Sequence, residues 1–137
     1  MKIKDIMLKP ILIRQEASKK ELLEIAKKNK NMPIFMVVDD DNKFLGDIHE
    51  NDLFYMVIPN KRYKDIGAEL EFNLEKKFFA KTAKEIMRKH DLICSPDESI
   101  IDAALKLASV EINEMPVIDK KGRVIGVITQ GLLLRHL

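Results

Sequence analysis

The feature that most constrains the fold is an internal repeat. When the sequence is aligned with itself at an offset of 80 residues, 11 of the 54 aligned pairs are identical. In the first copy these positions are Lys4, Ile6, Met7, Lys9, Leu12, Ile13, Val37, Asp39, Gly46, Ile48 and Leu53. Chance similarity between apolar segments is the alternative, but it would not place five ordered blocks in one register. The alignment therefore indicates one supersecondary unit used twice.

The apolar pattern predicts the same order in each copy: strand, helix, strand, strand, helix. The short run 11–13 is the first strand, and Leu22, Leu23, Ile25 and Ala26 form one face of the helix. The matching face in the second copy is Ile100, Ile101, Ala104, Leu105, Leu107 and Ala108. It matches best at an offset of 82, which indicates a helix displaced along the chain. Ser95 is the predicted N-cap of this second helix, followed by Pro96 at the first helical position.

A hairpin and a short closing helix complete each copy. The first hairpin is expected over 34–48 around the polar turn 39–42, and the second over 117–129 around 119–122. Gly122 suits a turn position with positive φ. The closing helices are predicted over 52–58 and 132–137. We expect the two copies to fold as one unit, because each alone is near the lower size limit for an independent core.

Between the copies lies an insert. Residues 1–58 form the first repeat, 59–83 a linker and 84–137 the second repeat. Within the linker, 68–81 carries apolar residues among charges, which predicts an amphipathic helix. Structural bracing of the two repeats is the favoured role for this helix, with a partner surface as the alternative.

Composition excludes several classes of protein. The chain has 24 Lys and Arg against 22 Asp and Glu, so its net charge of +2 gives no reason to expect nucleic acid or an anionic membrane as partner. Its only cysteine, Cys94, excludes a disulfide framework and is interpreted as a buried strand residue. No apolar run approaches a membrane span or a signal peptide, so a cytoplasmic location is expected.

The residues also lack the common arrangements for catalysis and metal binding. There is no glycine-rich phosphate loop of either common spacing. The acidic run 39–42 resembles the start of a calcium loop, but Lys43 and Phe44 stand where a ligand and a glycine would be needed. The three histidines do not have zinc-site spacing. We therefore expect no metal site, no required cofactor and no catalytic activity.

At the level of motifs the chain resembles the CBS domain family. The entry motif of that family is similar to 5–7 and to 85–87, and its hairpin signature is similar to 115–129, with 36–49 as the counterpart. The resemblance covers both repeats. It implies an α+β fold of two tandem β-α-β-β-α repeats packed as one pseudo-twofold module, and a homodimer of such modules. It also implies that AMP, ADP, ATP or S-adenosylmethionine binds in clefts between the repeats and that binding regulates a partner protein.

The resemblance assigns a favoured first cleft. Members that bind nucleotide carry Ser or Thr after the last hairpin strand and Asp three residues later. Here these positions are His49 and Asp52. Asp52 could accept hydrogen bonds from ribose hydroxyls, and His49 could donate to a phosphate. Alternatively, His49 is a half-exposed strand end and Asp52 the N-cap of the closing helix. The base would contact residues on the first strand and hairpin, namely Ile11, Ile13, Phe35 and Met36, although ordinary core is the favoured interpretation of Ile13.

The second cleft is the weaker candidate. Thr129 retains the hydroxyl, but Leu132 replaces the ribose acceptor. The family pattern places four residues against the base, namely Asp91, Ile93, Met115 and Pro116, although Ile93 and Met115 are also expected as ordinary core. Arg88 could bind a phosphate, with a solvated surface position as its alternative.

Together these patterns favour a free-standing regulatory module that binds an adenosine-containing ligand and signals to a partner. The alternative is a structural or dimerisation module that has lost its ligand and acts by protein contact.

Overall fold

The structure is a computed structural model that describes residues 1–66 and 72–137. Its strands are β1 (Leu12–Arg14), β2 (Ile34–Val38), β3 (Phe44–His49), β4 (Glu114–Ile118) and β5 (Val124–Thr129). Its helices are α1 (Lys19–Lys28), α2 (Glu50–Val57), α3 (Phe72–Phe79), α4 (Ala83–Ile86), α5 (Ile100–Val110) and α6 (Gln130–His136), with 3-10 turns η1 (Ile3–Asp5) and η2 (Asn60–Asp65). The expected α+β fold of two repeats is confirmed.

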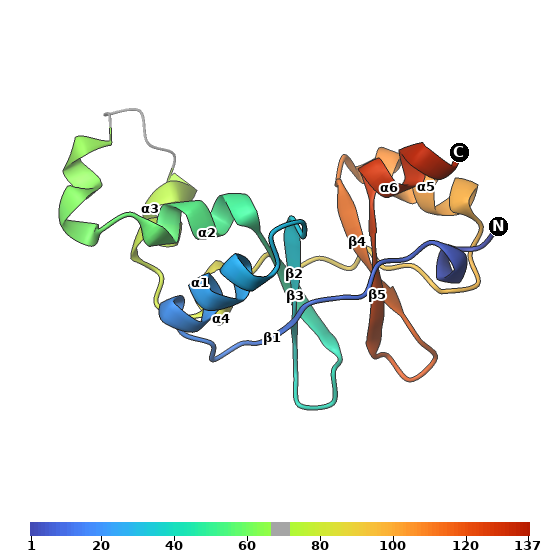
Figure 1. Cartoon of the computed structure of the whole chain (residues 1–137), viewed down its shortest axis with the longest axis horizontal. Helices are drawn as coiled ribbons and strands as arrows, with labels where there is room; N and C mark the ends of the chain where they lie inside the picture. Colours follow the sequence, from blue (N-terminus) through green and yellow to red (C-terminus); the bar gives the residue numbers. More distant parts are fainter. Residues whose placement is uncertain (67–71) are drawn as a thin grey trace.

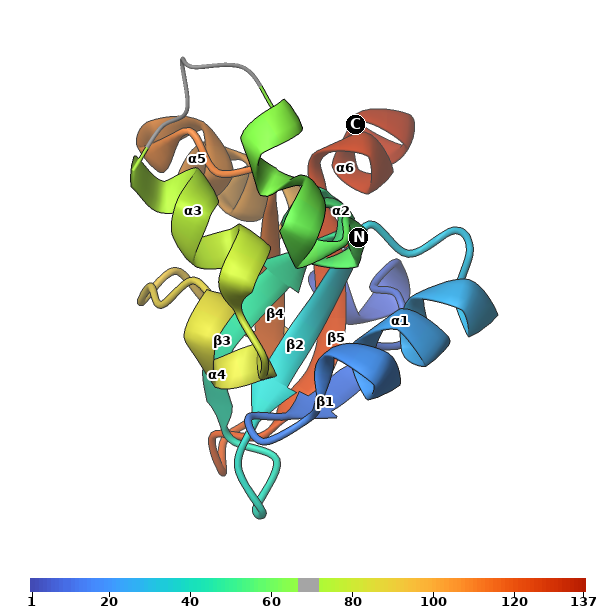
Figure 2. The same cartoon turned by 90° about the vertical axis from the view of Figure 1, so that its left-hand side faces the viewer.

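The two repeats place their sheets next to each other in the middle of the molecule. Figure 1 shows α1, α2 and α4 on one outer side of the sheets and α5 and α6 on the other. Figure 2, viewed from the side of the first repeat, shows the strands of both sheets behind one another. A small apolar core lies between the sheets, formed by Ile34, Met36, Val38, Val124 and Val127. Burial of these five side chains holds the halves together.

The two halves have the same strand register. In the first, β1 pairs parallel with β2, and β2 pairs antiparallel with β3 so that Ile34 lies opposite His49. In the second, β4 pairs with β5 and Glu114 lies opposite Thr129. The first strand of the second half is reduced to a single parallel bridge, from Cys94 to Val117. The strands of the two halves thus pair in the same way at positions 80 residues apart, which agrees with the internal repeat.

The entry segment of each repeat packs against the other repeat. The N-terminal segment pairs with the second half through reciprocal backbone hydrogen bonds of 3.0 Å between Leu8 and Val127. Arg88 likewise pairs with Asp47 of the first half, with bonds of 2.8 and 2.9 Å. Side chains follow the backbone, since Ile3 lies in the second core whereas Ala80, Ala83 and Ile86 lie in the first. This reciprocal exchange gives the module its pseudo-twofold arrangement.

Turns and caps explain most of the local structure. Both hairpins turn through a left-handed residue, Asn42 at φ 62° and Gly122 at φ 83°. The cap of α5, however, is Ser99, whose Oγ accepts a hydrogen bond from the Asp102 N–H, so the prediction of Ser95 was wrong. Ser95 instead belongs to a preceding turn, where its N–H donates to Glu98. Both serines are good caps, and only the second is followed directly by the apolar face.

The insert contains the expected helix in shorter form. Within the described residues α3 spans Phe72–Phe79, and the predicted start at 68 lies outside them. α3 lies beside α2 in Figures 1 and 2. The repeat boundaries at 58 and 84 stay a prediction. Among the described helices, none has the length and apolar character needed to cross a membrane.

Candidate functional site

A cluster of charged side chains lies where the two halves meet. Its centre is Asp47 of β3, whose side chain is 0% exposed. Arg88 Nε lies 3.2 Å from Asp47 Oδ1, and His90 Nε2 lies 2.6 Å from Oδ2. The Leu92 N–H donates to His90 Nδ1, so Nε2 carries the ring proton and donates to Asp47. A buried carboxylate is thus satisfied by two groups from the other repeat.

His49 and Glu114 extend this cluster across the junction. His49 ends β3, and its Nε2 accepts a hydrogen bond from the Arg88 guanidinium. The same nitrogen lies 3.3 Å from Oε2 of Glu114 on β4. Burial lowers the pKa of His49, and the Arg88 charge lowers it further. Burial raises the pKa of Glu114, because a charged carboxylate is poorly solvated there.

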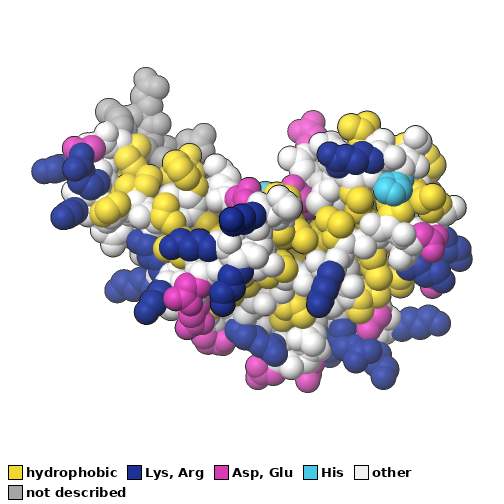
Figure 3. Space-filling view, in the orientation of Figure 1, with side chains coloured by type: hydrophobic (Ala, Val, Ile, Leu, Met, Phe, Trp, Pro, Cys, Tyr) yellow, Lys and Arg dark blue, Asp and Glu magenta, His cyan; other side chains and the backbone are white. Residues whose placement is uncertain are grey.

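Glu114 is the exception to hydrogen-bond satisfaction in this cluster. The residue is only 8% exposed, and its Oε2 has no hydrogen-bond partner in the described part of the chain. A buried acceptor without a donor costs free energy. The raised pKa agrees with this environment, because the protonated form needs less solvation. Figure 3 shows acidic and histidine side chains gathered in a notch between the halves.

Asp52 is close to this cluster and is fully engaged. It lies in the first turn of α2, where its Oδ2 accepts a hydrogen bond of 2.9 Å from the His49 N–H. Asp52 Oδ1 lies 2.9 Å from Nζ of Lys77 on α3, and the Asp52 side chain is only 4% exposed. The N-cap of α2 is therefore His49 and not Asp52, which caps the helix from its third position by accepting the His49 N–H. The insert supplies the second partner.

The apolar residues predicted for the first cleft are mostly core. Ile13 and Phe35 are buried in the first core, and Met36 is buried between the sheets. Ile11 is partly buried against the first core. Of the four, only Ile11 retains exposed surface. Whether they contact a ligand stays a prediction.

The residues predicted for the second cleft separate into two groups. Met115 and Pro116 are buried, and Thr129 caps α6 by accepting a hydrogen bond of 3.0 Å from the Leu132 N–H. Asp91 and Ile93 instead line an open recess of about 530 Å³ together with Lys43, Lys89, His90 and Phe44. Ile93 is 41% exposed there. Arg88 belongs to neither group, because it contacts His49 of the first cleft.

Sequence reasoning missed four members of this site: Asp47, His90, Glu114 and Lys77. One signal was available, since Asp47 and Glu114 are acids inside otherwise apolar strand patterns. The positions of His90 and Lys77 carried no such signal, because they depend on the path of the chain between repeats.

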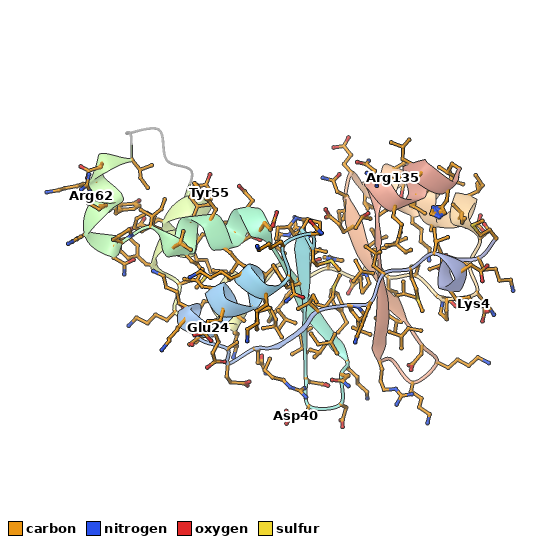
Figure 4. All side chains as sticks on the ribbon, viewed as in Figure 1. Lys4, Glu24, Asp40, Tyr55, Arg62 and Arg135 are labelled. Carbon is orange, nitrogen blue, oxygen red and sulfur yellow. The ribbon has the colours of Figure 1, made fainter. Side chains whose placement is uncertain are left out.

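The site offers hydrogen-bond chemistry rather than metal chemistry. Within the described residues, no three His, Cys, Asp or Glu side chains are placed to hold a metal ion. Cys94 lies apart in the second core, where burial raises the pKa of its thiol to about 12. Figure 4 shows the labelled Asp40 at the tip of the first hairpin, far from the helices that flank the notch. What the cluster offers is carboxylate acceptors beside arginine, lysine and histidine donors.

Comparison with known proteins places this geometry in a family. The model for the CBS domain matches residues 3–58 and 83–137. The uncharacterized protein MJ1426 of Methanocaldococcus jannaschii is 28% identical in an alignment 156 positions long, gaps included, which covers 100% of this chain and 91% of that protein. The homoserine O-acetyltransferase of Methanohalobium evestigatum is 34% identical over 82 residues, which cover 58% of this chain but only 17% of the enzyme.

Solved structures share the whole fold. The CBS domain pair of protein MJ0100, in complex with 5′-methylthioadenosine and S-adenosyl-L-methionine, has a TM-score of 0.75 and 27% identity, covering 99% of this chain and 94% of that one. CBSX2 in complex with AMP has a TM-score of 0.74 and 22% identity, covering 98% and 94%. At that identity the second similarity supports the fold alone.

Proposed function

This chain belongs to the CBS domain family, and from that premise we propose that it is a regulatory module that binds an adenosine-containing ligand between its repeats. The observation that carries the proposal is the convergence of His49 and Asp52 of one repeat with Arg88 of the other. A cleft built from both repeats can sense a ligand and transmit its presence, because the ligand would alter contacts that hold the halves together.

Each group in this cleft has a role suited to an adenine nucleotide. The Asp52 carboxylate would accept from the ribose hydroxyls, and Arg88 with His49 would donate to a phosphate. Of the apolar residues assigned to the base in this cleft, Ile11 retains exposed surface, whereas Phe35 and Met36 are covered. AMP, ADP, ATP and S-adenosylmethionine are the candidate ligands. The MJ0100 pair, whose complex contains two adenosine compounds, supports this class.

A titration tests the proposal directly. Thermal shift and calorimetry with AMP, ADP, ATP and S-adenosylmethionine are compared for wild type, Asp52→Ala and Asp40→Ala. A ligand at 100 times its Kd stabilises the fold by about 2.7 kcal/mol. We expect Asp52→Ala to lose this shift and Asp40→Ala, whose side chain is fully exposed at a hairpin tip, to retain it. Binding that survives Asp52→Ala undiminished would remove the site assignment.

A structural or dimerisation module without ligand is the second candidate. The observation in its favour is that both carboxylate oxygens of Asp52 already have partners. Absence of a shift with all four compounds would select this candidate. The cleft around Thr129 is the weaker ligand site in either case, because Leu132 provides no acceptor.

We further propose a homodimer, formed through the outer helices. A groove of about 380 Å³ runs between α5 and α6, and an equivalent groove lies between α1 and α2. Large apolar side chains are exposed around them, including Phe54, Leu105 and Leu134. Burial of such surface drives association. Light scattering should give a dimer for wild type and for Lys121→Glu, and a monomer for Leu134→Glu; a wild-type monomer at micromolar concentration would contradict the dimer.

A further inference from the structure

The insert helix contacts the candidate ligand site through a single charged side chain. Lys77 of α3 places its ammonium 2.9 Å from Asp52 Oδ1. The lysine side chain is partly buried, at 27% exposure, and covers the carboxylate. The neighbouring Lys76 on the same helix is exposed, and it pairs with no acidic side chain among residues 1–66 and 72–137. Lys77 is therefore singled out by position and not by the general charge of the helix.

Packing fixes where this lysine can lie. Phe78 is fully buried, and its ring meets Tyr63 of η2 with centroids 4.9 Å apart. After α3 the chain enters the first core at Ala80 and Ala83. With α3 anchored directly after Lys77 by Phe78, Ala80 and Ala83, the fold itself positions the ammonium against Asp52.

The consequence for ligand binding is competition. Asp52 Oδ2 is committed to the His49 backbone N–H, so Oδ1 is the oxygen left for a ribose hydroxyl. We propose that Lys77 is an autoinhibitory latch: it occupies Asp52 in the free protein and must leave Oδ1 when a ribose-bearing ligand binds. This inference rests on the proposed function. It adds a route by which ligand binding reaches the insert, because the release of Lys77 loosens the attachment of α3 to α2.

The latch makes a prediction whose sign is opposite to that of a ligand contact. Lys77→Met leaves the buried carboxylate without its cation, so a ligand that donates hydroxyls to Asp52 gains relative to the free state. We expect Kd to fall about two- to fivefold, because an ion pair of this kind contributes up to about 1 kcal/mol. The gain should be equal for AMP and for 5′-methylthioadenosine, because the latch acts at the ribose and the second compound has no phosphate.

Calorimetric titration of both compounds tests this. The variants are Lys77→Met and Lys77→Gln, with Lys76→Met as matched control and thermal melts to establish that each is folded. Hydrogen exchange of the 75–79 amides provides a second measurement, and AMP should accelerate exchange in wild type. Lys77 variants that bind like Lys76→Met would overturn the latch. Weaker AMP binding with unchanged 5′-methylthioadenosine binding would overturn it in favour of a direct phosphate contact. If wild type and all variants bind neither compound, the proposed function fails and the latch fails with it.

Discussion

Gly46 is the position where a single methyl group should do the most damage to the assembly of the two repeats. A Cβ built at this position would lie 2.6 Å from the carbonyl oxygen of Arg88, whereas ordinary contact begins near 3.4 Å. The obstacle is backbone, and it belongs to the segment that the second repeat contributes to the first. Gly46→Ala therefore forces the Arg88 segment away from β3.

The size of the effect follows from the contacts that would be broken. A displacement of about 0.8 Å, the difference between those two distances, lengthens the Asp47–Arg88 backbone hydrogen bonds of 2.8 and 2.9 Å beyond bonding range. Each bond contributes about 0.5–1.5 kcal/mol. Overpacking costs of 1–3 kcal/mol lead to the same range. We expect a loss of about 2–3 kcal/mol, which for a chain of this length lowers Tm by roughly 6–12 °C.

Two other glycines serve as controls. The three atoms nearest to a Cβ at Gly126 all belong to the Met7 side chain, with Sδ at 2.5 Å, and a flexible side chain moves more easily than backbone, so Gly126→Ala should cost less. Gly131 lies in α6, where the nearest obstacle is the end of the Arg135 side chain at 3.2 Å, so Gly131→Ala should be neutral or stabilising by up to about 1 kcal/mol. Calorimetric melts decide the order. A Gly46→Ala protein that melts within 2 °C of wild type, or no lower than Gly126→Ala, would refute the reasoning.

Three further predictions concern the cluster, the thiol and the caps. Burial raises the pKa of Glu114, so wild-type stability falls as pH rises above the ordinary carboxyl value of 4.5, and Glu114→Gln removes this loss. The difference between the urea midpoints of Glu114→Gln and wild type should therefore widen from pH 4 to pH 8, and a constant difference would contradict the prediction. The pKa of His49 is lowered, chiefly by burial, so stability also falls in both proteins as pH drops below 6.5. Because the pKa of the Cys94 thiol is about 12, a disulfide reagent at pH 8 should react only at the rate of unfolding, and rapid labelling of the native protein would contradict this. In urea titrations Ser99→Ala should destabilise the fold by about 1 kcal/mol and Ser95→Ala by less. The reverse order would indicate that Ser95, and not Ser99, is the N-cap of α5.

Sequence predicted the fold well because its determinants are local. Apolar spacing of two and of three to four residues separated strands from helices, and polar turns marked both hairpins. The repeat added long-range information, since the equal register of the two copies implied two similar units. The cap of α5 was misplaced because two serines compete there, and local chemistry alone does not decide between Ser95 and Ser99.

The candidate site was less predictable because its contacts are distant in sequence. Arg88 and Asp47 are 41 residues apart, and His90 and Asp47 are 43. Assigning residues to clefts by repeat placed Arg88 in the second cleft, whereas the exchange of entry segments brings it to the first. The pairing of Lys77 with Asp52 depends on how the insert returns over α2, and the family pattern contains no information on that path.

The exchange of entry segments also determines how a ligand could change the module. The core of each half includes residues from the other repeat, so neither half would have an intact core without the other half. The polar contacts at the junction belong to the same exchange, since Arg88 bonds Asp47 with its backbone and His49 with its side chain. A phosphate that recruits the Arg88 guanidinium would therefore compete with His49 and with the Asp47 carboxylate, without breaking the Arg88–Asp47 backbone pairing. The expected response is a change in side-chain contacts and in the position of α3, while the two halves remain joined through the backbone pairing of their entry segments.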